Sequence, residues 1–348
     1  MDTTDQQIKD LSNKIQKSET PDDLKERILL RIDQLSKLTK SPSFLPEYDR
    51  LNSYVEWILA IPWNKRTEDT LDLENARKIL DANHFGLEQI KDRILEYISV
   101  MKLKQKEGVG DDVVRAPILC FVGLVGTGKT TISAAIAKAL GRRFARIPFG
   151  GMGSPLDLRG QSRMESESEP GKIIKALRVA QCMNPVILLD EIDRVTDAGR
   201  SSIMGVLVEL LDPEQNNAFI DHYIDFPINL SEVLFIATAN NTHNISTAVL
   251  DRLEPIMMPS YTDEEKITIG KNYMLPKVIA NAGIGKNALI VRDDTWSKIV
   301  RPLGFDAGIR SLERTIEGMA RKVAKMIVEG KLEKVEITAE NVREFIPQ

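Results

Sequence analysis

Hydrophobic residues recur at helical spacing over about the first hundred residues of the chain. From Gln7 to about Lys40, Leu and Ile recur along one helical face of a strongly charged stretch that Pro21 divides. This pattern predicts a helical hairpin, with Thr20 as the N-cap of its second helix. Pro42 and Pro46 then interrupt the pattern. Three further helices are expected over roughly Asp49–Ala60, Leu73–Ala82 and Leu87–Leu103.

Four short apolar runs then replace the helical pattern. They lie at Ile118–Val122, Phe144–Phe149, Val186–Leu189 and Val233–Thr238, and helical patterns separate them. Nearly continuous apolar runs that alternate with helices are typical of a parallel sheet buried on both faces. The sequence therefore predicts an α/β fold with a doubly wound parallel sheet. Beyond Pro259 the spacing of apolar residues is helical again, which predicts a small, mostly helical unit at the C-terminal end.

The chain length agrees with this division. With 348 residues, the chain is longer than one typical domain and can bury sizeable cores. We divide it into an N-terminal helical arm (1–70), an α/β subdomain (71–256) and a helical subdomain (257–348). Hydrophobic residues make up 42% of the chain and charged residues 28%, which is typical of a globular protein and argues against disorder.

Charge and cysteine content exclude several classes of protein. The chain carries 47 Lys and Arg against 51 Asp and Glu, so it lacks the large positive field of a dedicated nucleic-acid binder. Its two cysteines, Cys120 and Cys182, make neither a disulfide framework nor a zinc site. No apolar run reaches the roughly 18 residues of a membrane-spanning helix. We therefore expect a cytoplasmic protein with no nucleic-acid or membrane partner.

The segment GLVGTGKT, residues 123–130, carries the clearest chemical signal. It fits the pattern G-x-x-x-x-G-K-[ST] and stands between the apolar run ILCFV and the helical pattern KTTISAAIAKAL. Glycines let the backbone amides of such a loop face phosphate groups, and the following helix adds a positive dipole end. Lys129 is expected to reach the phosphates of ATP or ADP, and Thr130 to hold Mg²⁺. The residues expected to bind the nucleotide here are Gly123, Gly126, Thr127, Gly128, Lys129, Thr130 and Thr131.

Polar side chains end two of the predicted strands. Asp190 and Glu191 end the run VILLDE, at the carboxyl edge of the sheet, where ligands bind in open α/β folds. Asp190 is expected to hold Mg²⁺ through water, and Glu191 to orient and polarise an attacking water molecule. Asn240 ends the run VLFIATAN. It is placed to orient that water or the γ-phosphate, and the alternative is the ordinary turn chemistry of Asn at a strand end.

Several longer segments resemble the AAA+ ATPase module of the Lon protease family, from roughly Leu45 to Pro347. They are ILAIPWNKRTEDTLDLENARKIL, HFGLEQIKDRILEYISVMKL, PGKIIKAL, LLDEID, LDPEQNNAFIDHYIDFPINLSEVLFIATAN, LDRLE and GIRSLER. The resemblance implies a P-loop NTPase fold with a helical lid as its last subdomain, Mg²⁺-dependent ATP hydrolysis and a homo-hexameric ring. It also implies that hydrolysis drives the unfolding and translocation of a protein substrate toward a peptidase.

The resemblance also implies roles for individual residues. The glycine-rich loop and the acidic strand end match the Walker A and Walker B motifs of the family. Asn240 matches sensor 1, Arg252 matches the arginine finger that reaches the neighbouring subunit's nucleotide, and Arg310 matches sensor 2 in the lid. The residues that match the adenine pocket are His84, Phe85 and Gly86. With Glu191, the residues Asn240, Arg252 and Arg310 are thereby expected to be catalytic.

Two features depart from the family. The family continues into a Ser-Lys peptidase domain, and the chain stops at Gln348, where that domain would begin, so we expect no peptidase activity from it. The family also carries an aromatic and an aliphatic residue on a loop that grips the unfolded polypeptide. Glu165 and Ser166 stand at these positions, in the acidic run Glu165–Glu169. This run is open to four interpretations: a solvated loop, a gate for basic segments, a cation-dependent loop, or a substitution that abolishes gripping.

These departures support a second hypothesis about function. The chain would then be an ATP-gated regulatory or assembly module that binds a partner, such as a peptidase, without translocating protein. The missing gripping residues favour this hypothesis, while the intact catalytic motifs are consistent with both, and the Lon-type ATPase remains the preferred one. A DNA-directed motor is the least favoured of the three, because the net charge is −4 and the loop is acidic.

Overall fold

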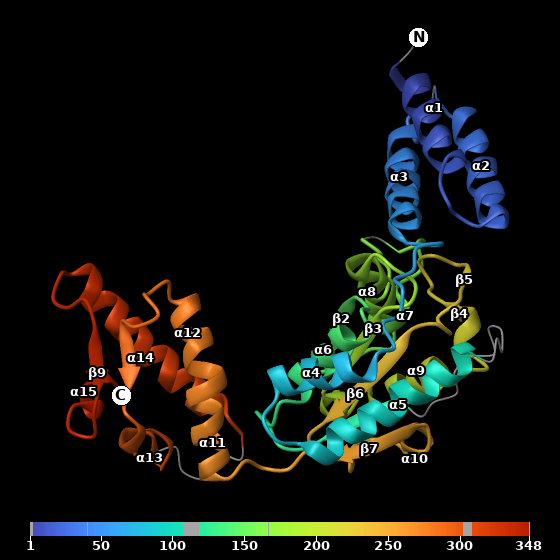
Figure 1. The fold of residues 1–348 in the computed structure, drawn as a ribbon. Helices are drawn as coiled ribbons and strands as arrows, with labels where there is room; N and C mark the ends of the chain where they lie inside the picture. The colour runs from blue at the N-terminus through green and yellow to red at the C-terminus, as the bar shows by residue number, and fades with distance from the viewer. Residues whose placement is uncertain (1–2, 40, 107–117, 166, 302–307, 348) are drawn as a thin grey trace.

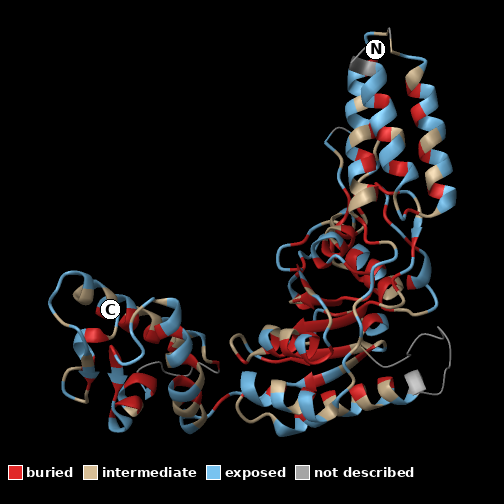
Figure 2. Ribbon diagram, turned by 45° about the horizontal axis from the view of Figure 1, so that its top comes forward, coloured by how far each residue is buried: buried red, intermediate tan, exposed pale blue. Residues whose placement is uncertain are grey.

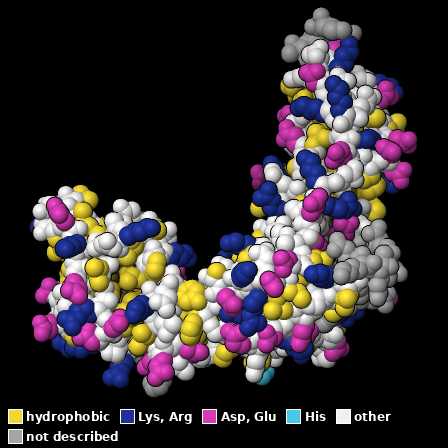
Figure 3. Space-filling model, in the orientation of Figure 1, with side chains coloured by type: hydrophobic (Ala, Val, Ile, Leu, Met, Phe, Trp, Pro, Cys, Tyr) yellow, Lys and Arg dark blue, Asp and Glu magenta, His cyan; other side chains and the backbone are white. Residues whose placement is uncertain are grey.

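The computed structural model describes residues 3–39, 41–106, 118–165, 167–301 and 308–347. A bundle of N-terminal helices, an α/β unit with a central sheet, and a smaller C-terminal unit follow one another along the chain (Figure 1). Among the described helices, none is both long enough and apolar enough to cross a bilayer. On the face in Figure 3, Lys and Arg side chains are interspersed with Asp and Glu over the N-terminal bundle, so neither sign of charge dominates there.

The N-terminal arm is a bundle of three helices, α1 (Thr3–Gln16), α2 (Asp22–Ser36) and α3 (Phe44–Ala60). Its buried Leu and Ile residues belong to the same hydrophobic cluster as one face of the sheet. Tyr54 on α3 is buried and donates a hydrogen bond from its hydroxyl to the carbonyl of Ile224 (3.0 Å). The arm is therefore packed onto the α/β unit and shares its core.

Two local predictions in the arm are wrong. Pro21, and not Thr20, occupies the N-cap of α2 and makes no side-chain cap, while the Thr20 hydroxyl accepts a hydrogen bond from Ser18 (2.9 Å). The third helix begins at Phe44 and not near Asp49, so it contains Pro46. Proline is tolerated there because the first turn of a helix leaves its backbone N–H groups without intrahelical partners.

Five parallel strands form the central sheet, in the spatial order β2-β3-β6-β1-β7. Four of them confirm the predicted apolar runs to within one residue at each end. The fifth, β7, was not predicted, because it is an edge strand with only Leu253 and Ile256 buried and Pro255 at its centre. The bounds are β1 (Ile118–Val122), β2 (Phe144–Pro148), β3 (Val186–Asp190), β6 (Leu234–Ala239) and β7 (Leu253–Met257).

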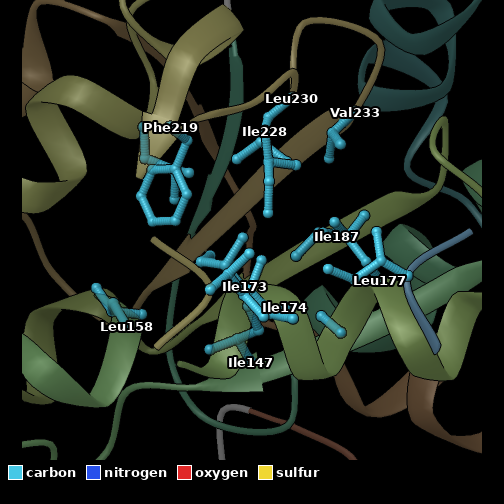
Figure 4. Packing of buried hydrophobic residues seen from close by; sticks show 14 of the residues in the cluster. Ile147, Leu158, Ile173, Ile174, Leu177, Ile187, Phe219, Ile228, Leu230 and Val233 are labelled. Carbon is cyan, nitrogen blue, oxygen red and sulfur yellow. The ribbon is translucent and has the colours of Figure 1, made fainter. Parts of the chain in front are cut away.

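Helices cover both faces of this sheet, as expected for a doubly wound fold. One face buries its apolar side chains against α4 (Leu73–Asn83), α5 (Glu88–Lys106) and α6 (Lys129–Ala139). The other face packs against α8 (Lys172–Ala180) and α9 (Arg200–Leu210). Figure 2 shows the strands as an almost continuous buried layer, and Figure 4 shows α8 side chains in contact with the β2 and β3 face. The carboxyl edge of the strands is thereby held rigidly in place.

The C-terminal unit has a hydrophobic cluster of its own. Its longest helix, α14 (Arg310–Val328), buries apolar residues at the helical spacing expected beyond Pro259. A short parallel pair, β8 (Leu289–Val291) with β9 (Val335–Ile337), was not expected. The remaining elements are α7 (Leu156–Arg159), β4 (Phe219–Ile220), β5 (Pro227–Ile228), α10 (Thr247–Leu250), α11 (Asp263–Ile269), α12 (Leu275–Asn281), α13 (Trp296–Val300) and α15 (Val342–Phe345).

Candidate functional site

The glycine-rich loop 123–130 joins β1 to α6 at the carboxyl edge of the sheet. Gly126 (φ 86°) and Gly128 (φ 95°) adopt left-handed backbone conformations, which side chains other than glycine rarely tolerate. The buried Thr127 hydroxyl donates to the carbonyl of Leu124 (2.9 Å) and closes the turn between them. The sequence pattern therefore forms a tight backbone turn that leads straight into the N-terminus of α6.

Three other parts of the chain hold this loop. The amide of Gly123 donates to the carbonyl of Ala239 on β6 (3.1 Å). The Tyr261 hydroxyl donates to the carbonyl of Thr127 (3.1 Å), from the segment that links the sheet to the C-terminal unit. The amide of Ile309 donates to the carbonyl of Gly126 (3.1 Å), just before α14 begins. The loop is thus bonded to the sheet and to the C-terminal unit at the same time.

Lys129 is the first residue of α6, and its side chain is directed back into the loop. The ammonium donates to the carbonyls of Gly123 (2.5 Å) and Leu124 (3.0 Å) and to Oδ1 of Asn240 (3.1 Å). Burial lowers the pKa of Lys129 below its usual value. The Nδ2 group of Asn240 is buried and has no hydrogen-bond partner among the described residues. The structure therefore brings Lys129 and Asn240 together, with one amide donor left over.

Asp190 and Glu191 lie where β3 ends. The Oδ1 atom of the buried Asp190 accepts a hydrogen bond from the Thr238 hydroxyl (2.5 Å), and that hydroxyl accepts one from the amide of Glu191 (2.9 Å). Glu191 has φ 56° and ψ 51°, a left-handed conformation that is uncommon outside glycine. Such strain persists only where the surroundings hold it, and it is frequent at functional sites.

Arg146 is a residue of this site that the sequence analysis missed. Its guanidinium donates from Nε to Oδ2 of Asp190 (2.7 Å), and its Nη2 lies 2.5 Å from the same oxygen in an ion pair. The two residues are 44 positions apart in the chain and meet because β2 and β3 are paired in parallel. No local motif surrounds Arg146, so only a prediction of which strands are neighbours could have suggested the contact.

The two predicted arginines lie in different surroundings. Arg310 is the first residue of α14 and directly follows Ile309, which is bonded to the glycine-rich loop. Arg252 precedes β7 and donates to Oδ2 of Asp212 (3.0 Å) and to the carbonyl of Ala248 (2.8 Å). A backbone hydrogen bond from Glu214, followed by the bond from Arg252, lowers the pKa of Asp212. Both arginines therefore lie beside ordered backbone, and Arg252 is held by residues of its own chain.

His84, Phe85 and Gly86 lie at the end of α4, between the α/β unit and the C-terminal unit. The buried His84 ring has Nε2 at 3.0 Å from the Thr131 hydroxyl, and its Nδ1 has no hydrogen-bond partner among the described residues. Burial, with a smaller contribution from the charge of Lys91, lowers the pKa of His84 to about 4. Phe85 packs against the hydrophobic cluster of the C-terminal unit. The imidazole is therefore neutral at pH 7 and lies beside the start of α6.

The loop 160–171, which contains the acidic run, has firmly bonded ends. The carboxylate of Asp221 is fully buried and accepts hydrogen bonds from the amides of Gly171 (2.7 Å), Tyr223 (2.9 Å) and Ile224 (3.1 Å). Burial raises the pKa of Asp221 above its usual value. The amide of Gln161 donates to the carbonyl of Glu169 (3.2 Å) and joins the two sides of the loop.

The tip of this loop lies at the surface, and one of its residues touches the arm. Met164 is 89% exposed. The Arg163 guanidinium lies 4.1 Å from the centre of the Tyr54 ring on α3 and 3.4 Å from a carboxylate oxygen of Asp225. Ser166, predicted to stand at the aliphatic gripping position, lies outside the described residues. The described part of the loop therefore combines an exposed tip with a contact to the helical arm.

Two family descriptions match parts of the chain. Residues 119–261 match the ATPase family associated with various cellular activities (AAA). Residues 280–336 match the Lon protease AAA+ ATPase lid domain. The chain contains a Lon-like AAA+ module. This confirms the family resemblance and the α/β fold followed by a helical lid.

Curated relatives agree with this Lon-like module along nearly its whole length. The Lon protease of Heliobacterium modesticaldum is 40% identical over 337 residues, which are 97% of this chain and 40% of that protein. Lon protease 1 of Bacillus subtilis is 41% identical over 340 residues, 98% of this chain and 43% of that protein. The chain thus spans about two fifths of the length of these relatives. The match therefore concerns the Lon-like module and not the whole length of those proteases.

We expect His84 to make the folded Lon-like module sensitive to acid. Its pKa is about 4 in the fold and about 6.5 in an unfolded chain, so the unfolded state binds more protons between these values. Stability is therefore lost as the pH falls through this window. Between pH 7 and pH 5, the native protein should lose about 1–2 kcal/mol of unfolding free energy more than a His84→Gln variant. Urea unfolding at both pH values measures this difference.

A second histidine provides the control. His222 is exposed, so a His222→Gln variant should keep the pH dependence of the native protein. If His84→Gln and the native protein lost the same free energy of unfolding between pH 7 and pH 5, the prediction that His84 is buried as a neutral imidazole would be contradicted.

Proposed function

We propose that this Lon-like module hydrolyses ATP with Mg²⁺ as its metal ion. One observation carries the proposal: the glycine-rich loop, its lysine and the acidic end of β3 meet at the carboxyl edge of one sheet. Lys129 is bonded to Asn240 on β6, and Asp190 and Glu191 are bonded to Thr238 on the same strand. Ligands of open α/β sheets bind at this edge.

The residues present fit a nucleotide with its metal ion. Two buried polar atoms, Nδ1 of His84 and Nδ2 of Asn240, have no partner among the described residues, and each can bond a polar ligand atom. The left-handed glycines Gly126 and Gly128 give the loop the kind of turn in which anion-binding loops direct successive amides toward one side. Thr130 and Asp190 offer the oxygen atoms that Mg²⁺ prefers. When bound, Mg²⁺ would neutralise negative charge on the phosphate oxygens.

The chain's own residues then have separate tasks. Lys129 exchanges its bonds to loop carbonyls for bonds to the β- and γ-phosphates. Glu191, fixed by its strained backbone, accepts a hydrogen bond from the attacking water and orients it for in-line attack on the γ-phosphorus. Asn240 positions this water or the γ-phosphate from the neighbouring strand, and Arg310 supplies positive charge from the lid. Catalysis is thus mostly positioning and charge neutralisation.

We further propose that the working form is a homo-hexameric ring in which Arg252 acts on the neighbouring subunit's nucleotide. Its two bonds, to Asp212 and Ala248, fix its guanidinium on its own subunit in a defined position. An arginine finger supplied by a neighbouring subunit accelerates phosphoryl transfer by about 10³- to 10⁵-fold, so ATP turnover would require assembly of the ring. Coupling of hydrolysis to protein unfolding and translocation is part of the same proposal, because the relatives are Lon proteases.

We expect a Glu191→Gln variant to bind nucleotide normally and to lose ATP hydrolysis. Glutamine keeps the size of the side chain but cannot polarise the attacking water, so turnover should fall by about 10²-fold or more. Phosphate release measures turnover, and a fluorescent ADP analogue measures binding. A Glu96→Gln variant, changed at an exposed position on α5, is the matched control and should behave as the native protein. Equal turnover by Glu191→Gln and native protein would contradict the assignment.

We expect an Arg252→Ala variant to lose turnover by about 10³-fold and to regain it in mixed rings. In a mixture with Glu191→Gln, some Arg252→Ala subunits receive an intact finger from a neighbour, so the mixture should hydrolyse faster than either variant alone. Sedimentation velocity verifies that rings form. An Arg343→Ala variant, changed at an exposed position on α15, serves as the control. Failure of mixing to raise the rate would contradict a finger that acts between subunits.

A second candidate function is an ATP-gated regulatory or assembly module that does not translocate protein. The observation that favours it is the acidic loop 160–171, which has Glu165 where the family carries an aromatic gripping residue. A stably folded fluorescent protein with an unstructured tag distinguishes the two functions. Loss of fluorescence with ATP, and not with a non-hydrolysable analogue, would support translocation. Retained fluorescence during continued ATP hydrolysis, together with unfolding by a Glu165→Tyr variant, would support the second function.

A further inference from the structure

Both carboxylate oxygens of Asp190 already accept a hydrogen bond from other residues of the chain. A carboxylate offers about four lone-pair directions for hydrogen bonds. The Thr238 hydroxyl uses one of them on Oδ1, and Arg146 uses one on Oδ2 through Nε, with its Nη2 2.5 Å from the same oxygen. Water molecules bound to Mg²⁺ would therefore have to compete with these donors for Asp190.

The two partners of the ion pair differ in burial. The Asp190 side chain is 4% exposed, whereas the Arg146 side chain is 52% exposed. A carboxylate withdrawn from water needs a compensating charge or several hydrogen bonds. Arg146 supplies both and, being half in solvent, can leave without itself losing hydration. It is thus the exchangeable member of the pair, while Thr238 is buried and fixed.

We propose that Arg146 is a built-in counter-cation that competes with Mg²⁺ for Asp190 and so sets the magnesium concentration at which the site is filled. This inference rests on the proposed function, because it takes Asp190 to be part of the magnesium site. Arg146 is a positioning residue: it holds the Asp190 carboxylate and moves aside when the metal ion neutralises that carboxylate. Two cations close to one carboxylate repel each other, so each weakens the binding of the other.

Two other roles for Arg146 make different predictions. If Arg146 bound a phosphate group of the nucleotide directly, its removal would weaken nucleotide binding with or without Mg²⁺. If it only stabilised the fold, its removal would lower the melting temperature and leave the magnesium dependence unchanged. Competition predicts a third result: nucleotide affinity without Mg²⁺ is unchanged, and less Mg²⁺ is needed.

The test is a titration of Mg²⁺ into the full chain with a fluorescent ADP analogue, starting from EDTA. For Arg146→Met, which keeps the aliphatic stem and removes the charge, we expect half-saturation at about three- to tenfold less Mg²⁺ than for the native protein. Analogue affinity in EDTA should stay within about twofold of the native value. Without nucleotide, the melting temperature should fall by about 2–6 °C, because Asp190 loses its counter-charge.

Two further variants complete the test. Arg146→Lys keeps the charge but loses the guanidinium whose Nε and Nη2 both approach Oδ2, so its magnesium half-saturation should lie between those of native protein and Arg146→Met. This variant also keeps the test valid if Arg146→Met does not fold. Arg143→Met is the matched control, because Arg143 is exposed and directly precedes β2. It should titrate as the native protein does.

The outcomes separate the inference from the function on which it rests. An unchanged magnesium half-saturation in both Arg146 variants overturns the competition, and so does an equal loss of analogue affinity in EDTA and in Mg²⁺. If the native protein bound the analogue but Mg²⁺ left its affinity and its ATP hydrolysis unchanged, the proposed magnesium function itself would be overturned. Half-saturation at a lower Mg²⁺ concentration in Arg146→Met, with an intermediate value in Arg146→Lys, supports the proposal.

Discussion

The backbone of the glycine-rich loop is held from three sides, and the geometry of the whole site depends on this. Its carbonyl and amide groups are bonded to β6 at Ala239, to the connecting segment at Tyr261 and to the start of α14 at Ile309. The loop cannot shift without disturbing one of these bonds. Because Ile309 directly precedes α14, the lid and the candidate phosphate-binding backbone are mechanically linked. A change in the position of the lid therefore shifts the loop, and a shift of the loop changes the position of the lid.

The polar side chains of the site are fixed by partners from distant parts of the chain. Lys129 is held by carbonyls and Asn240, Asp190 by Thr238 and Arg146, and Arg252 by Asp212. Such pairing keeps charged groups in defined positions and compensates for their burial. It also means that a ligand must replace existing bonds instead of making entirely new ones. Binding free energy then reflects the difference between two sets of contacts, which favours sharp selection between ions and phosphate groups of similar charge.

The sequence predicts those parts of the fold whose signal is local. Four strands and the long helices are predicted from continuous or periodic runs of apolar residues. The glycine-rich loop is predicted from the spacing of its Gly, Lys and Thr residues. The strand Leu253–Met257 was not predicted, because Pro255 interrupts it and its edge position leaves it without the continuous apolar run by which buried strands are recognised. Thr20 stands next to the start of the second helix, which predicts a cap, but its hydroxyl bonds to Ser18 because such hydroxyls can bond in either direction along the chain. The contact of Arg146 with Asp190 depends on strand order, which no local pattern encodes.

The buried carboxylate of Asp221 has a consequence for how the loop 160–171 can vary. It bonds the amide of Gly171 at one end of the loop, and the backbone bond from Gln161 to Glu169 joins the two sides, so these attachments do not involve the side chain of Met164. The exposed Met164 can therefore be exchanged without a large cost in stability, whereas Arg163 contacts Tyr54 and Asp225. The exposed side chain at this tip can thus change independently of the bonds that hold the loop.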